Sequence, residues 1–72
     1  MNMYKRLREL REDFDKSQEE ISKIIGTSQS YYAQYENGKR AIPFERVAIL
    51  AKYYNVSLDY IAGLIDTPRK LK

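Results

Sequence analysis

The chain has 72 residues and a formal charge of +3, and it contains neither cysteine nor histidine. It therefore has no disulfides, no thiolate metal ligands and no histidine base, which argues against metal centres and most hydrolytic enzymes. At this length a chain buries only about 60% of the surface that it exposes when unfolded, so there is room for one modest core. The small positive charge fits a polyanionic partner but does not require one.

Residues 3–14 repeat apolar side chains with the spacing of an amphipathic helix. Met3, Leu7, Leu10 and Phe14 recur at i, i+4, i+7 and i+11 and so share one face. Charged residues lie off this face, namely Lys5, Arg6, Arg8, Glu9 and Glu12. The pattern predicts a first helix that buries its apolar face.

A second helix is predicted over about residues 18–25. Ser17 and Glu20 match the S-x-x-E capping box, in which each side chain satisfies a backbone N–H at a helix start. The buried side of this helix would consist of Ile21, Ile24 and Ile25. Gly26 can take the left-handed conformation that ends a helix.

A third helix is predicted to follow almost at once. Ser28 can cap it, it reaches Glu36, and Asn37-Gly38 ends it. A connection of only about three residues between the second and third helices is the spacing of a helix-turn-helix motif.

The last two predicted helices follow Pro43 and Ser57. Pro43 suits a first helical position, and Ile49 falls off the apolar stripe of the fourth helix. That stripe contains Phe44, Val47, Ala48, Leu50, Ala51 and Tyr54. Ser57 caps a short fifth helix, 58–62, which Gly63 ends. Its side chains would close the core through Leu58, Ile61 and Leu64.

The expected fold class is therefore all-α, a compact five-helix bundle with a helix-turn-helix. Residues 1–65 would form one domain, and residues 66–72 a frayed, basic tail. No alternating pattern is long enough for a strand, and no window has the roughly 20 apolar residues of a membrane span. The N-terminus lacks an apolar signal segment, so we expect a soluble, cytoplasmic protein. Because cysteine and histidine are missing, we expect no metal, and we expect no cofactor.

The third helix has two chemically different sides. At about 100° per residue, Tyr31, Tyr32 and Tyr35 fall on one side. The other side carries no charge and little bulk, and consists of Gln29, Ser30, Ala33 and Gln34. Glutamine can donate to and accept from adenine, serine can do either with several bases, and alanine leaves room for a thymine methyl. Such residues are also common on ordinary surfaces, so this face alone does not decide the function.

With these segments in this order, the chain resembles the Cro and repressor branch of helix-turn-helix DNA-binding domains, the XRE-like group. The resemblance covers about residues 4–64. It rests on "SQEEISKIIGTSQS" for the turn, "YYAQYENGKR" for the end of the third helix, and "IPFERVAILAKYYNVSLDYIAGL" for the last two helices. The resemblance implies a DNA-binding transcriptional regulator of prokaryotic or phage type, a repressor, rather than an enzyme.

Carried over residue by residue, the resemblance makes residues 28–36 the recognition helix in the major groove. It implies base-reading positions at Gln29, Ser30, Ala33 and Gln34. It implies phosphate contacts from Gln18, Ser28, Tyr31, Asn37, Lys39 and Arg40. The Tyr31 hydroxyl could meet a phosphate or the ring could simply pack, and Arg40 could also reach a narrow minor groove. Exposed cations such as Lys39 and Arg40 are otherwise ordinary solvated charges.

The family pattern also implies a structural ion pair between Arg11 and Glu36, which would orient the recognition helix against the first helix. Asp15-Lys16 replaces the usual Gly-apolar pair between the first two helices, so that linker departs from the pattern. Ser22 replaces a small residue and needs a hydrogen bond, for which a carbonyl one turn back is available. Tyr32 replaces an aliphatic residue, so its ring needs space and its hydroxyl a partner.

The expected partner is a double-stranded DNA operator, bound by a homodimer because one such helix reads only a few base pairs. Candidates for the dimer contact are Ile49, Tyr53, Tyr60, Ile61 and Leu64.

Three other functions fit the sequence less well. An enzyme would need paired carboxylates in a pocket, and the candidates lie mainly on predicted polar faces: Glu9, Glu12, Asp13 and Asp15. A basic helix for membranes or calmodulin-like partners is disfavoured because acidic residues interrupt its cationic face. The stronger alternative is an antitoxin-like module that grips another protein through some of its seven tyrosines.

Overall fold

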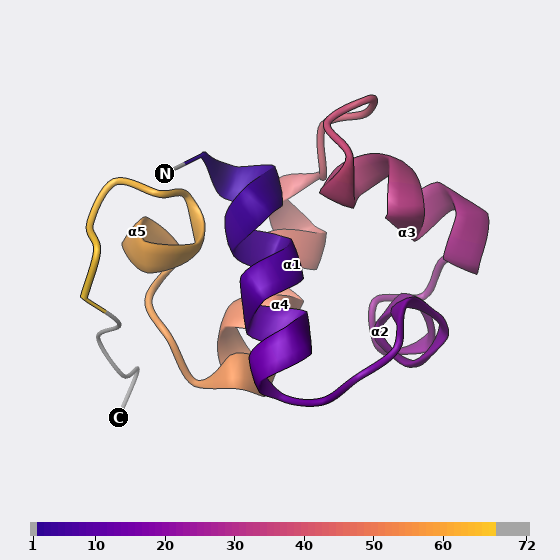
Figure 1. The fold of residues 1–72 in the computed structure, drawn as a ribbon, viewed down its shortest axis with the longest axis horizontal. Helices are drawn as coiled ribbons and strands as arrows, with labels where there is room; N and C mark the ends of the chain where they lie inside the picture. Colours follow the sequence, from indigo (N-terminus) through magenta and orange to yellow (C-terminus); the bar gives the residue numbers. More distant parts are fainter. Residues whose placement is uncertain (1, 68–72) are drawn as a thin grey trace.

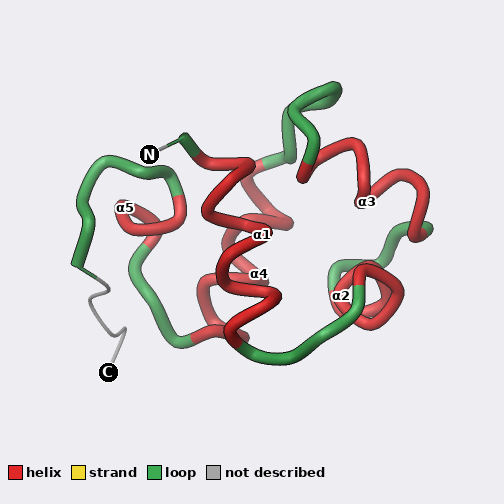
Figure 2. Tube along the Cα trace, viewed as in Figure 1, coloured by secondary structure: helices red, strands yellow, loops and turns green. Residues whose placement is uncertain are grey.

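A computed structural model describes residues 2–67, and these residues form five helices and no strand. The helices are α1 (Met3–Asp13), α2 (Gln18–Ile24), α3 (Gln29–Glu36), α4 (Phe44–Tyr54) and α5 (Leu58–Ile61). In Figure 1, α1 and α4 occupy the middle of the view, with α2 and α3 on one side and α5 on the other. Figure 2 shows that short loops join these helices. The prediction of an all-α fold with five helices is confirmed for this part of the chain.

The helices start where their capping side chains predict. Ser17 accepts from the Glu20 backbone N–H at 3.1 Å, and the Glu20 carboxylate accepts from the Ser17 N–H at 3.1 Å, so both halves of the capping box form. Ser28 caps α3 through the Tyr31 N–H, and Ser57 caps α5 through the Tyr60 N–H. These bonds satisfy donors that a helix start otherwise leaves unpaired.

Left-handed residues end the first two helices. Gly26, at φ +77°, follows α2, and the Thr27 N–H donates to the Ser22 carbonyl at 2.9 Å, which closes the last turn. Asp15 takes the same role after α1 at φ +55°, and the Lys16 N–H donates to the Arg11 carbonyl at 3.0 Å. The linker that departs from the family pattern thus keeps a tight helix end, with an aspartate in a conformation that usually favours glycine or asparagine.

The core draws side chains from all five helices and from the two loops beside α4. Two tyrosines of α3, Tyr32 and Tyr35, are its largest fully buried side chains. The other members are Leu7, Leu10, Ile21, Ile25, Ile42, Val47, Leu50, Ala51, Tyr54, Val56 and Ile61. The tyrosines of α3 therefore pack this helix against the core, and the opposite side of the helix lies at the surface.

The structure corrects the predicted positions of several apolar residues. Pro43 is the N-cap of α4 rather than its first helical residue, and Phe44, which begins the helix, is 68% exposed. Helical side chains point back toward the N-terminus of their own helix. The side chain of Phe44, the first residue of α4, therefore extends past the start of the helix into solvent. Leu64 is 76% exposed because α5 has already ended, and Phe14, the C-cap of α1, keeps part of its ring in solvent.

Arg6 is buried, although the sequence pattern places it off the apolar face. Its side chain is only 4% exposed. The guanidinium lies 3.8 Å from the centre of the Tyr60 ring and 3.7 Å from the Asp66 carboxylate. A long cationic side chain can bury its stem and stack its head on an aromatic ring, which the apolar spacing does not reveal.

Of the predicted tail, residues 66 and 67 are described, and the remainder, 68–72, lies outside the described residues. Within the described part of the chain, none of the helices is long and apolar enough to cross a membrane.

Candidate nucleic-acid interface

The turn between α2 and α3 holds the two helices in contact with each other. Ser22 is buried at their junction, and its hydroxyl donates to the Glu19 carbonyl at 2.7 Å. The hydrogen bond predicted for the buried Ser22 hydroxyl therefore forms within α2, to a carbonyl one turn back. Ser22 also accepts the Thr27 N–H through its backbone carbonyl, so this buried residue takes part in closing the turn after α2.

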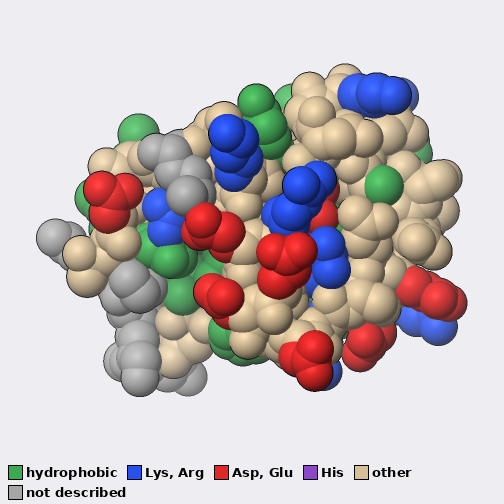
Figure 3. Space-filling view, viewed as in Figure 1, with side chains coloured by type: hydrophobic (Ala, Val, Ile, Leu, Met, Phe, Trp, Pro, Cys, Tyr) green, Lys and Arg blue, Asp and Glu red, His purple; other side chains and the backbone are tan. Residues whose placement is uncertain are grey.

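The two sides of α3 are separated as the helical geometry predicts. Tyr32 and Tyr35 are buried, whereas Gln29 and Ser30 are exposed and Ala33 and Gln34 are half-buried. All four side chains of the neutral side belong to one helix and open onto the surface. In Figure 3 the region over α3 is mostly neither hydrophobic nor charged, while acidic and basic side chains mix over α1.

A buried carboxylate at the end of α3 binds this helix to α1. Glu36 is only 2% exposed, and Arg11 of α1 donates to both of its oxygens, from Nε at 2.7 Å and from Nη2 at 3.1 Å. Arg8 adds a longer ion pair at 3.7 Å. The same Arg11 donates to the Lys16 carbonyl at 2.9 Å, so one guanidinium joins α1, the linker after it and the end of α3. Bidentate pairing of this kind fixes geometry strongly.

Gln18 joins the same cluster, which the sequence analysis did not foresee. Its amide nitrogen donates to the Glu36 carboxylate at 3.2 Å, so the first residue of α2 is bound to the last residue of α3. Nothing in the spacing of the chain predicts this pair, because eighteen residues separate its members. The bond holds the Gln18 side chain in place at the N-terminal end of α2, where backbone N–H groups and the helix dipole favour an anion.

The hydrogen bonds to Glu36 determine its charge state. Burial by itself would raise the pKa of Glu36, but the interactions with Arg11, Tyr32 and Gln18 outweigh burial and hold the pKa below its ordinary value. The pKa of Arg11 is raised, chiefly by its hydrogen bond to Glu36. Both groups therefore stay charged. Burial, together with the adjacent Glu36 carboxylate, raises the pKa of the Tyr32 hydroxyl.

The loop after α3 carries the cations predicted to face phosphates. Asn37, Gly38, Lys39 and Arg40 are all exposed. The Asn37 side chain accepts from the Lys39 N–H at 3.1 Å, which closes a local turn. Gly38 has φ +79°, and a Cβ placed on it would lie 3.2 Å from the Tyr4 ring of α1. The loop is therefore shaped by its own turn and by an aromatic ring beneath it.

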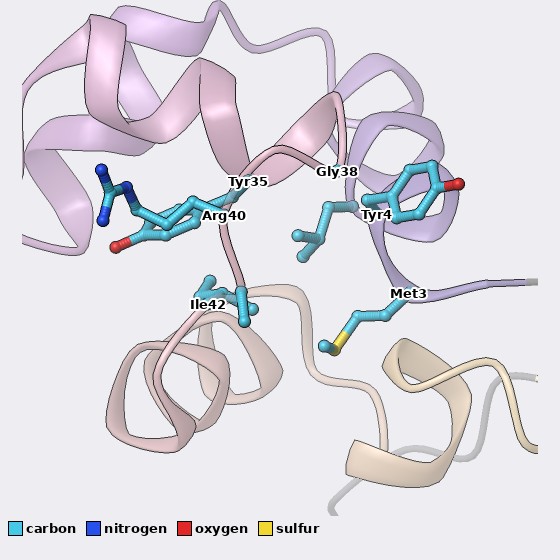
Figure 4. A pocket seen from close by; sticks show the side chains of 8 residues that line it. Met3, Tyr4, Tyr35, Gly38, Arg40 and Ile42 are labelled. Carbon is cyan, nitrogen blue, oxygen red and sulfur yellow. The ribbon is translucent and has the colours of Figure 1, made fainter.

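An apolar pocket of about 250 Å³ lies under this loop. It is lined by Met3, Tyr4, Leu7, Tyr35, Gly38, Arg40, Ala41 and Ile42. Figure 4 shows that Met3 and Tyr4 lie on one side of this pocket, whereas the charged end of Arg40 reaches away from them. The loop thus has an apolar underside and a cationic outer edge.

Arg40, Tyr31 and Gln34 form a second group that the sequence analysis did not bring together. The Arg40 guanidinium lies 4.6 Å from the centre of the Tyr31 ring, and its Nε donates to the Gln34 amide oxygen at 3.3 Å. Tyr31 packs edge-on against Tyr35 with ring centres 5.8 Å apart. The Tyr31 ring is therefore a platform for a cation. The six-residue separation of Gln34 and Arg40 crosses the end of a helix, where periodicity no longer predicts contacts.

The five side chains predicted to form a dimer contact differ in their exposure to solvent. Ile61 is fully buried in the core, so the prediction that it contacts a second copy is wrong. It occupies the inward side of the single turn of α5, and Tyr60, beside it, is half-buried over Arg6. Ile49 and Leu64 are exposed, and half-buried Tyr53 lines a groove of about 480 Å³ between the ends of α1 and α4.

Two short helices held in contact by a tight turn, with the second presenting a neutral polar face, define a helix-turn-helix domain. The chain matches the model of the Helix-turn-helix family over residues 7–61 and belongs to that family. The match extends over most of the described helices.

Several known proteins are similar to this chain. The uncharacterized HTH-type transcriptional regulator YobD of Bacillus subtilis (strain 168) is 41% identical over 63 residues, which are 88% of this chain and 56% of that protein. The cryptic phage CTXphi transcriptional repressor RstR of Vibrio cholerae is 38% identical over 62 residues, 86% of this chain and 56% of RstR. The chain thus spans about half the length of these curated relatives.

Among solved structures, the P22 c2 repressor in complex with a synthetic operator superposes with a TM-score of 0.77 and 26% identity. The alignment covers 85% of this chain and 92% of the repressor chain.

Proposed function

We propose that this chain binds double-stranded DNA in a sequence-specific manner and acts as a transcriptional repressor. The observation that carries the proposal is the uncharged outer face of α3, held rigidly by Glu36 and flanked by the cationic loop 37–40. Its glutamine and serine side chains can read base edges in a major groove. The solved P22 c2 repressor bound to an operator, and the repressor RstR, support this choice.

In the proposed complex, Gln29, Ser30, Ala33 and Gln34 face the bases. Phosphates are met by side chains and backbone N–H groups around this face, from Gln18, Ser28, Tyr31, Asn37, Lys39 and Arg40. Ser28 accepts the Tyr31 N–H through its oxygen and still has its own O–H to donate. The role of Glu36 and Arg11 is structural, because a carboxylate near the phosphate backbone would be repelled.

We propose further that the protein binds as a homodimer, with two-fold related copies reading half-sites about one helical turn apart. Exposed Ile49 and Leu64, and half-buried Tyr53 and Tyr60, are the candidates for the contact. Changing Ile49 or Leu64 to glutamate is expected to shift sedimentation toward the monomer and to weaken binding to a two-half-site duplex more than to a single half-site. Equal sedimentation of the variants and the parent would remove these residues from the contact. A role on DNA implies a cytoplasmic location.

The base-reading role is tested by Gln29→Ala. This change is expected to cost about 1 to 3 kcal/mol on the preferred duplex and to relax preference at one base position. Equal weakening on every sequence would contradict base reading by Gln29.

The phosphate role is tested by Lys39→Ala, with Lys52→Ala as the matched control. Lys39 lies in the loop before α4, whereas Lys52 is an exposed lysine in the last turn of that helix. Loss of Lys39 should weaken binding to all duplexes alike and lower the slope of log affinity against log salt by about one, because one fewer counterion is released. Loss of Lys52 should leave the slope unchanged. An unchanged slope for Lys39→Ala, or an equal fall in both variants, would exclude Lys39 as a specific phosphate contact.

A further inference from the structure

Arg40 forms two hydrogen bonds with Gln34 and a cation–π contact with the ring of Tyr31. Its backbone N–H donates to the Gln34 carbonyl at 3.2 Å, and its side-chain Nε donates to the Gln34 amide oxygen at 3.3 Å. The guanidinium also lies over the Tyr31 ring at 4.6 Å. The backbone hydrogen bond sets where the Arg40 side chain begins, and the guanidinium at its end lies over the Tyr31 ring.

This arrangement constrains the Gln34 amide. A glutamine amide has a soft terminal torsion and can offer either its oxygen or its nitrogen to a base edge, so a free glutamine is a permissive reader. In the structure the amide oxygen faces a cationic donor, and the amide nitrogen lies 3.4 Å from the Ser30 carbonyl. Turning the amide over would place its N–H₂ group against the guanidinium, where two donors meet. Arg40 therefore favours one orientation of the amide.

We propose that Arg40 determines base specificity by acting through Gln34. It is a positioning residue that holds the amide in one orientation, with the Tyr31 ring holding Arg40 itself. This inference rests on the proposed DNA-binding function and adds to it, because a phosphate contact by Arg40 would be independent of sequence. The stacked, planar guanidinium suits this role, since it loses less freedom for each hydrogen bond than a flexible lysine does.

The prediction concerns one base pair. Arg40→Lys keeps the positive charge but loses the planar fork and its stacking. It should reduce preference at the base pair that Gln34 reads by roughly threefold to tenfold, a part of what a well-placed amide contributes. Tyr31→Leu, which removes the platform and leaves Arg40 intact, should reduce preference at the same base pair.

The experiment is a double-mutant cycle. Sites are selected from a random duplex library with the parent protein, and every single-base variant of the selected site is titrated against the parent, Arg40→Lys, Gln34→Ala and the double variant. If Arg40 acts through Gln34, Arg40→Lys changes preference at one position in the parent and changes nothing further there when Gln34 is already alanine. The Gln34→Ala background is thus the matched control.

Two results would overturn the inference while leaving the proposed function intact. One is equal weakening of all sequences by Arg40→Lys, which describes a phosphate contact. The other is the same change of preference in both backgrounds, which describes a direct contact of Arg40 with a base. If the parent protein enriches no site, the proposed function fails and this inference fails with it. Circular dichroism of each variant identifies any loss of binding that comes from unfolding.

Discussion

The sharpest structural prediction concerns the buried carboxylate behind α3. Glu36→Gln keeps the shape of the side chain and removes its charge. In the parent, the Arg11 guanidinium forms two hydrogen bonds with this carboxylate, and Gln18 forms a third. After the change, Arg11 faces a neutral amide in a site where its own side chain is only 14% exposed. The variant should therefore leave a largely buried cation without its counter-charge.

The expected cost is about 3 kcal/mol, at the lower end of what breaking a buried pair costs, because the amide oxygen can still accept one hydrogen bond. A domain of this size has a total stability of about 4 to 11 kcal/mol, so the change removes a large share of it. The melting temperature should fall by roughly 12 to 24 °C. Replacement of a surface glutamate should change the stability by less than about 0.5 kcal/mol.

The assay is urea unfolding of the parent, Glu36→Gln and the control Glu9→Gln, which alters an exposed glutamate of α1. Because the folded pKa of Glu36 is lowered, its stabilisation is complete above the unfolded pKa of about 4.3 and is lost as the pH falls through the folded pKa. The parent and Glu36→Gln should therefore differ most near neutral pH and converge in acid. Equal stability of Glu36→Gln and Glu9→Gln at pH 7, or a gap that does not narrow in acid, would refute the reasoning.

Three further predictions concern stability. Gly38→Ala should destabilise more than Gly26→Ala, because both glycines have positive φ but only the Cβ at position 38 meets the Tyr4 ring. The strain alone costs about 1 to 2 kcal/mol, and equal losses in thermal unfolding would exclude a role for the ring. Tyr54→Phe should be neutral or stabilise by up to about 1 kcal/mol, since its buried hydroxyl makes no hydrogen bond within residues 2–67; a clear loss in urea unfolding would contradict this. Arg6→Met should be tolerated, because Met keeps the contact with Tyr60 and removes an unsatisfied buried Nε, whereas Arg6→Ala should cost about 2 kcal/mol of lost packing. Equal melting temperatures for the two Arg6 variants would contradict the packing argument.

Local signals predicted the helices well. The capping box at Ser17 and Glu20, the serine caps at positions 28 and 57, and the left-handed Gly26 act within four residues, so the sequence contains all the partners that they need. The division of α3 into an aromatic and a neutral side likewise follows from helical geometry alone. These features sufficed to place the candidate interface on α3.

Features that depend on neighbours distant in the sequence were harder to predict. The exposure of Phe44 and Leu64 depends on where α4 begins and where α5 ends, and the burial of Arg6 depends on a ring in α5. The bond from Gln18 to Glu36 and the stacking of Arg40 on Tyr31 join residues across a turn or a loop. Hydrophobic periodicity describes one element at a time, so it contains no information about such pairs.

The measurement that tests the account most directly is selection of bound sites from a random duplex library, followed by titration of the selected site against scrambled DNA at two salt concentrations. Sequence-specific binding by a homodimer predicts a two-fold symmetric site that is strongly preferred over scrambled duplex, with binding to both duplexes weakening as salt rises. Selection of no site, with only weak and salt-sensitive binding to any duplex, would contradict sequence-specific recognition by α3 and favour a protein partner instead.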